Sequence, residues 1–142
     1  MSQIYIPAAI RRAVQAASNG QCAYCRSQPS NSGIPLHFEH ILALALGGLN
    51  VFANLCMACS PCNLHKGMLT HGLDPLTNEM LALFHPRQQK WNEHFTWDES
   101  GTLVVGITSV GRATVNALQL NNALLVEARG IWIKAGTHPP LD

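Results

Sequence analysis

Hydrophobic residues recur at helical spacing near the start of the chain. Ile10 and Val14 share one face of a helix predicted over residues 7–18. Two further helices are predicted over residues 112–120 and 122–134, with a break near Asn121. The pattern therefore places helical elements on both sides of a less regular middle section.

The middle section shows shorter elements with many turn residues between them. Residues 36–41 predict a short strand, residues 54–58 open a helical or knuckle segment, and residues 63–67 continue as a short helix. Further along, residues 95–97 and 103–107 predict a β-hairpin around a polar turn. The sequence thus indicates strand and helix elements in succession, as in an α+β protein.

Composition indicates one folded unit of modest size. The chain has 142 residues, of which 47% are hydrophobic and 12% charged, which argues against disorder. We expect an N-terminal part over residues 1–73 and a C-terminal extension over residues 74–142 that packs on it as one compact unit. The aromatic side chains expected to make that contact are Phe84, Trp91, Phe95, Trp97 and Trp132.

Two absences bear on location. The longest apolar stretch, residues 41–46, is too short to span a bilayer, so no membrane partner is expected. The N-terminal residues show no basic region followed by an apolar run, so no secretory signal is expected. We therefore expect a cytoplasmic protein whose thiols stay reduced.

Charge is divided unevenly between the two parts. Residues 1–73 carry four basic residues and one acidic residue, a net charge of +3, while residues 74–142 carry five basic and seven acidic residues, a net charge of −2. The first part is therefore the better candidate for contact with phosphate. This part also holds cysteines, and four thiolates bound to one Zn²⁺ would add a charge of about −2 there. The candidate contacts are Lys66, His65, Arg11 and Arg12, and a solvated helix face is the alternative interpretation.

Four of the five cysteines form two Cys-x-x-Cys pairs. The first pair is Cys22 and Cys25, and the second is Cys59 and Cys62. Two pairs supply four thiolates to one tetrahedral zinc and leave no open position, so we expect a structural zinc that does not catalyse. The alternative, a redox dithiol, would need only one pair. Cys56 lies in an apolar stretch and is expected to be buried without binding metal.

Between the two pairs lies Glu39, the only acidic residue of the first 73 positions, and His40 follows it directly. The simpler interpretation is a surface carboxylate beside a hydrogen-bonded core histidine. Their place between the cysteine pairs favours a catalytic metal site. Asn63, whose amide oxygen could also bind an ion, follows Cys62 directly and would be held in place by the zinc. Carboxylate and amide oxygens suit Mg²⁺ or Mn²⁺. Since neighbours on a strand point to opposite faces, one residue can bind the ion while the other acts on a water.

The order of these motifs resembles the zinc-containing branch of the HNH endonucleases. The shared elements span residues 22–67, about a third of the chain, and are Cys-x-x-Cys at 22–25, Glu-His-Ile at 39–41, Gly-Gly at 47–48, Asn-Leu at 54–55 and Cys-x-x-Cys-Asn-x-x-Lys-Gly at 59–67. Later segments, such as the one from Trp91 to Trp97, resemble the C-terminal extension of bacterial HNH proteins and say less about function.

The resemblance implies a fold and a set of residue roles. The fold is α+β, with a ββα-metal core and Cys₄ zinc knuckles, flanked by an N-terminal helix and a C-terminal extension of a hairpin and helices. His40 matches the general base, Glu39 a ligand of the catalytic divalent ion, and Asn54 the residue that ties the loop and helps to orient the histidine. Asn63 stands at the position of the final histidine, so the chain resembles an HNN variant with an amide oxygen as ligand.

These implications predict an endonuclease that hydrolyses double-stranded DNA, with a structural Zn²⁺ and a catalytic Mg²⁺ or Mn²⁺. A non-catalytic zinc module that binds nucleic acid or protein is the alternative, but it has no need for Glu39, His40 and Asn63 together. A third interpretation is a nicking partner inside a larger nuclease complex. Cutting of both strands by one small site would imply a homodimer or such a complex.

Overall fold

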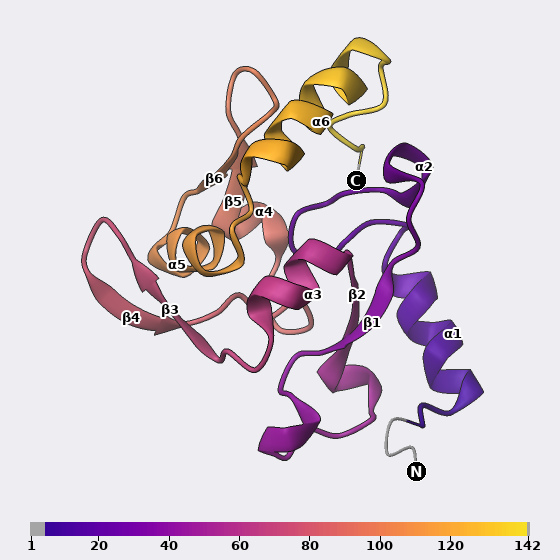
Figure 1. Ribbon diagram of the computed structural model, residues 1–142. Helices are drawn as coiled ribbons and strands as arrows, with labels where there is room; N and C mark the ends of the chain where they lie inside the picture. Colours follow the sequence, from indigo (N-terminus) through magenta and orange to yellow (C-terminus); the bar gives the residue numbers. More distant parts are fainter. Residues whose placement is uncertain (1–4, 142) are drawn as a thin grey trace.

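The computed structural model describes residues 5–141. The expectation about a secretory signal falls partly on residues 1–4, which lie outside the described residues. Within that range the chain is an α+β structure in which helices surround three two-stranded antiparallel sheets (Figure 1). The α+β fold class is therefore confirmed. No helix of the described residues is long and apolar enough to cross a membrane.

The N-terminal part is built on the hairpin of β1 (His37–His40) and β2 (Leu55–Ala58). Helix α1 (Ala8–Ala17) lies on one side of this hairpin, and α3 (Ser60–Lys66) lies on the other (Figure 1). Helix α1 matches the prediction for residues 7–18. Strand, strand and following helix together form the expected ββα arrangement.

The prediction of a helical or knuckle segment over residues 54–58 was wrong, because residues 55–58 form β2. All four residues of this strand are buried. Leu55 and Met57 pack with Val14 of α1, whereas Cys56 and Ala58 belong to the larger core on the other face. A strand buried on both faces has a continuous apolar sequence, which periodicity cannot distinguish from a buried helix.

The C-terminal part holds two more hairpins and two longer helices. Strands β5 (Phe95–Trp97) and β6 (Val104–Gly106) form the predicted hairpin. Helix α5 (Ser109–Leu118) begins at Thr108, whose hydroxyl accepts a hydrogen bond from the Gly111 amide, and α6 (Ala123–Lys134) begins at Asn122, whose side chain accepts from the Leu125 amide. Both helices were predicted to within three residues. The remaining elements are α2 (Pro29–Ser32), the 3₁₀ turns Leu44–Leu46 and Phe52–Asn54, α4 (Trp91–His94), and the unpredicted hairpin of β3 (His71–Asp74) and β4 (Glu79–Ala82).

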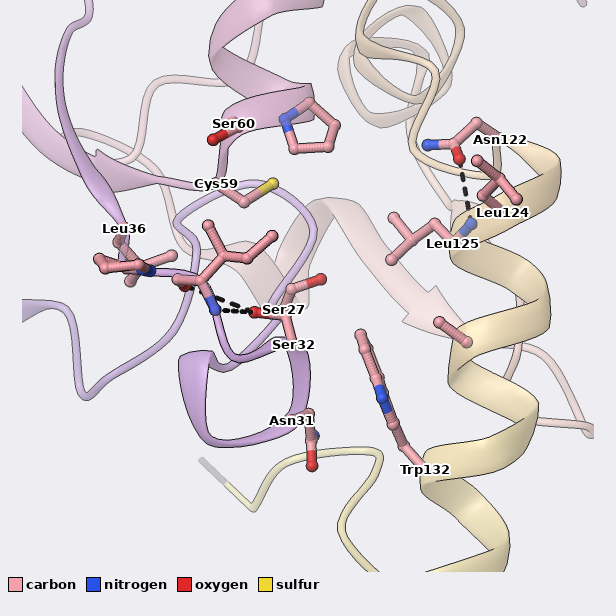
Figure 2. Close-up of a pocket in the computed structure, with 14 residues that line it drawn as sticks. Ser27, Asn31, Ser32, Leu36, Cys59, Ser60, Asn122, Leu124, Leu125 and Trp132 are labelled. Carbon is pink, nitrogen blue, oxygen red and sulfur yellow. Dashed lines mark hydrogen bonds between the residues drawn. The ribbon is translucent and has the colours of Figure 1, made fainter.

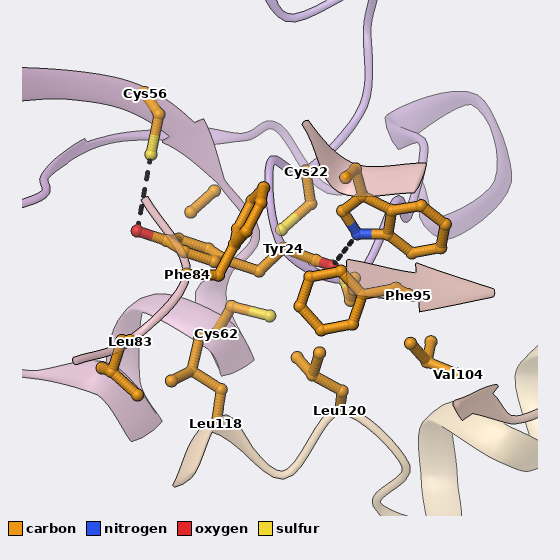
Figure 3. Packing of buried hydrophobic residues seen from close by; sticks show 13 residues of the cluster. Cys22, Tyr24, Cys56, Cys62, Leu83, Phe84, Phe95, Val104, Leu118 and Leu120 are labelled. Atoms are coloured by element: carbon orange, nitrogen blue, oxygen red, sulfur yellow. Dashed lines mark hydrogen bonds between the residues drawn. The ribbon is translucent and has the colours of Figure 1, made fainter. Parts of the chain in front are cut away.

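One large core joins the cysteine-rich segment to the C-terminal extension (Figure 3). Phe95 lies at its centre, with ring centroids 5.2 Å from both Phe84 and Trp91. The indole Nε1 of Trp91 donates a 2.8 Å hydrogen bond to the carbonyl of Tyr24, between the first two cysteines. These rings therefore share one core with the cysteine pairs. The other buried members are Cys22, Cys25, Cys56, Ala58, Cys62, Leu83, Val104, Leu118 and Leu120.

Candidate functional site

The four cysteines of the two Cys-x-x-Cys pairs converge on one point. Their sulfur atoms all lie within 4.8 Å of one another, and the Sγ atoms of Cys25 and Cys59 are 3.4 Å apart. A tetrahedral zinc with Zn–S bonds of about 2.3 Å requires sulfur separations of roughly 3.8 Å. The donor set therefore fits a structural zinc. Within residues 5–141 it is the only such cluster of three or more His, Cys, Asp or Glu side chains.

The backbone explains why these sulfurs meet. The Cys22 amide donates to the Ser27 carbonyl, and the Ala23 amide donates to the Met57 carbonyl, both at 2.9 Å. The first knuckle is therefore closed on itself and attached to β2. Cys59 precedes the first turn of α3, which brings Cys62 to the same side of the helix start.

Cys56 is separate from this cluster, as predicted. It is 1% exposed in β2, and its thiol lies 3.8 Å from the Tyr24 hydroxyl. Burial, followed by the negative charge of Glu39, raises the pKa of the Cys56 thiol to about 12. The side chain is thus a buried neutral thiol rather than a fifth ligand.

Glu39 lies in the interior with both carboxylate oxygens engaged. It is 3% exposed, Oε1 is 3.0 Å from the Nζ of Lys66, and Oε2 accepts a 2.9 Å hydrogen bond from the Tyr24 hydroxyl. Burial raises the pKa of the Glu39 carboxyl, although the Lys66 charge opposes this effect. In this arrangement both carboxylate oxygens are bound by protein groups and the side chain is almost closed to solvent.

His40 ends β1 and faces the other side of the hairpin. Residues opposite one another in an antiparallel pair share a face. Glu39 pairs with Cys56 on the side of the large core, whereas His40 pairs with Leu55 on the side of α1. The Nε2 atom of His40 lies 2.6 Å from the Oδ1 atom of Asn50. Asn50 was not singled out from the sequence, where it carried no signal beyond its place between the Gly-Gly and Asn-Leu elements.

Asn54 ties together the loop that follows His40. Its Oδ1 accepts from the Leu42 amide at 2.8 Å, and its Nδ2 donates to the carbonyls of Leu42 and Leu49, both at 3.0 Å. Gly48 lies so close to the Leu42 carbonyl that a β-carbon there would overlap it. The loop therefore has an asparagine at its centre and a glycine where no side chain fits, while the catalytic role that the resemblance implies for Asn54 stays a prediction.

Asn63 lies in α3 and lines an open groove of ≈ 680 Å³. His37, whose Nε2 is 2.9 Å from the Ser60 hydroxyl, contributes to the same groove, as does His65. Neither Glu39 nor His40 lines it. Glu39 and Asn63 are thus not joined in one open site, and their joint binding of a divalent ion stays a prediction.

The four candidate phosphate contacts separate into two kinds. Arg11, Arg12 and His65 are exposed. Lys66 is 2% exposed, and its Nζ atom is held by the Glu39 carboxylate and by two backbone carbonyls. Sequence reasoning treats a lone lysine as a surface residue, and here that default does not hold.

An apolar pocket of ≈ 430 Å³ lies near the zinc knuckles, between the start of α3 and α6 (Figure 2). Trp132 and Leu125 of α6 face Leu36 and Cys59 across it (Figure 2). None of the residues predicted for catalysis lines this pocket.

Comparison with known proteins supports the class indicated by these features. The model of the HNH endonuclease family matches residues 22–75, the segment that contains both cysteine pairs, Glu39, His40, Asn54 and Asn63. The resemblance to the HNH endonucleases is therefore confirmed for this segment. No solved structure matches the chain significantly.

A curated relative extends the similarity beyond that segment. The Septu protein PtuA of Bacillus mycoides (strain KBAB4) is 27% identical over 135 residues. The alignment covers 78% of this chain and 19% of that protein. The chain thus spans about a fifth of the length of the curated relative.

Proposed function

We propose that this chain is an endonuclease that hydrolyses DNA phosphodiester bonds, with His40 as the general base. The observation that carries the proposal is the loop after β1, where Asn54 makes three backbone hydrogen bonds and Asn50 contacts the imidazole. If Nε2 donates its hydrogen to Asn50 Oδ1, the lone pair of the neutral ring resides on Nδ1. That nitrogen can then accept a proton from the attacking water.

The Cys₄ cluster has a structural part in this proposal. Zn²⁺ would hold the first knuckle and the start of α3 together, and so fix the position of β2 and of the strand end that bears His40. Mg²⁺ or Mn²⁺ remains the proposed catalytic ion, with Glu39 and Asn63 as its candidate ligands. Glu39 is not open to an ion while Lys66 is bound to it, so no step is assigned to that ion here.

The test is cleavage of supercoiled plasmid by the zinc-replete full chain with Mg²⁺, Mn²⁺ or EDTA. We expect nicking or linearisation that requires the divalent ion and falls by roughly 10²–10⁴-fold in His40→Ala. The matched control is His37→Ala, a histidine on the same strand that lies against Ser60 instead. Cleavage that survives in His40→Ala, or an equal loss in both variants, would refute His40 as the base.

The burial of Glu39 favours a second candidate function, a zinc-stabilised module that binds nucleic acid or protein without cutting. A carboxylate engaged by Lys66 and Tyr24 serves a structural purpose that such a module would share. Absence of cleavage with every metal, by folded protein that contains zinc, would favour this function or a nuclease that needs a partner.

A further inference from the structure

We propose that Glu39 and the carbonyls of His40 and Ile41 form a cation site that Lys66 fills with its own ammonium group, so that a hard divalent cation reaches Glu39 only when Lys66 leaves. The inference rests on the proposed function in one respect, because the site borders the proposed base. It adds a competition between a side chain and a metal ion.

The geometry around Lys66 is that of an all-oxygen cage. Its Nζ atom is 3.0 Å from Glu39 Oε1, 3.3 Å from the His40 carbonyl oxygen and 2.7 Å from the Ile41 carbonyl oxygen. Lys66 and Glu39 are both buried. The cage therefore consists of a carboxylate and two backbone carbonyls at the end of β1, closed from one side by the last turn of α3.

The same three oxygens have the chemistry of a divalent-ion site. Mg²⁺ and Mn²⁺ bind carboxylate and carbonyl oxygens. A buried carboxylate also requires a compensating positive charge, because an unpaired charge in the interior is strongly unfavourable. Lys66 meets that requirement in this structure, so a metal ion and the ammonium group compete for one place.

The experiment measures Mn²⁺ binding by electron paramagnetic resonance on the zinc-replete full chain. The variants are the parent protein, Lys66→Ala, and Lys66→Ala combined with Glu39→Gln, with Lys90→Ala as a control at an exposed lysine. We expect Mn²⁺ to bind at least tenfold more tightly to Lys66→Ala than to the parent protein or to Lys90→Ala. The combined variant should lose this gain, because it lacks the carboxylate.

Equal Mn²⁺ affinity in the parent protein and Lys66→Ala would overturn the proposal, and so would a gain that persists without Glu39. If Lys66→Ala does not fold, the parent protein supplies the test through its amide resonances. Mn²⁺ at micromolar concentration should leave the amides of Glu39, His40 and Ile41 unbroadened, and selective broadening there would show that Lys66 does not exclude the ion. Because these readouts do not depend on cleavage, an inactive protein would refute the nuclease without deciding the cation site.

Discussion

The hydroxyl group of Tyr24 donates a 2.9 Å hydrogen bond to the carboxylate of Glu39. Tyr24 lies between Cys22 and Cys25, so the residue that contacts the carboxylate belongs to the first Cys-x-x-Cys segment. The backbone carbonyl of Tyr24 in turn accepts from the indole of Trp91. The cysteine cluster, the buried carboxylate and the aromatic core are thus linked through a single residue.

Tyr24→Phe should weaken the fold without loss of zinc. The change leaves a buried carboxylate short of one donor, which costs about 1–3 kcal/mol. Urea unfolding measures the free energy, and metal analysis measures the zinc content. Tyr5→Phe, at an exposed tyrosine, is the control. Equal stability of the two variants would show that the Tyr24–Glu39 bond contributes nothing.

Cys59→Ser should lose zinc and unfold or aggregate, because the three remaining thiolates cannot complete the tetrahedral site. Cys56→Ala should keep its zinc, since this thiol lies outside the cluster. Metal analysis after gel filtration distinguishes the two outcomes. Zinc retained in Cys59→Ser, or lost in Cys56→Ala, would contradict the assignment of the four ligands.

Asn54→Ala should reduce cleavage more than it reduces stability. The variant loses three hydrogen bonds to Leu42 and Leu49, which together contribute about 1–3 kcal/mol, and it frees the loop that holds the proposed base. Urea unfolding and the plasmid assay are run in parallel. Asn116→Ala is the control, because its amide makes one exposed bond to Leu73. Unchanged cleavage in folded Asn54→Ala would remove the loop from the mechanism.

The stability of the protein should fall in acid through Asp74. Its carboxylate accepts two 3.0 Å hydrogen bonds from Arg112 and further bonds from the Leu76 amide and the Thr77 hydroxyl. The Arg112 contacts hold the pKa of Asp74 well below its usual range. An acid with a lowered folded-state pKa adds stability above its unfolded pKa of about 3.9 and loses that contribution as the pH falls towards the folded value.

Asp74→Asn should therefore be less stable than the parent protein at pH 6 and should show a shallower loss of stability between about pH 4 and pH 2. Urea unfolding at several pH values measures both effects. Glu79→Gln, at the exposed residue opposite Asp74 in the hairpin, is the matched control. If the free energy of unfolding falls equally steeply with decreasing pH in both variants, Asp74 is not the source of the acid sensitivity.

Local spacing was enough to predict several features of the site. The two cysteines of each pair are three positions apart, and this spacing pointed to the cluster that the four sulfurs form. The hydrogen bonds of Asn54 are also local, since they reach no further than twelve residues along the chain. Helix α1 could be predicted from the spacing of Ile10 and Val14, because both residues lie on the face of the helix that packs against β2.

Long-range packing determined what the sequence could not predict. Lys66 is buried because α3 closes on the end of β1, 25 residues earlier in the chain. Lys66 belongs to the Cys-x-x-Cys-Asn-x-x-Lys-Gly element, but that element does not indicate that its side chain is buried. The hairpin of β3 and β4 was missed for a similar reason, since it is stabilised by α5 through Asp74, Arg112 and the close approach of Gly72 to Ala113.

The shared core also limits how the segment matched by the family model can be moved between proteins. The family match ends at residue 75, yet Phe84, Trp91 and Phe95 cover the zinc knuckles. A fusion junction placed at residue 75 would expose the apolar faces that these rings cover and invite aggregation. A transplantable unit must therefore include the buried members of this core, the last of which is Leu120. Engineering a chimaera from this chain means transferring the aromatic cover together with the metal site.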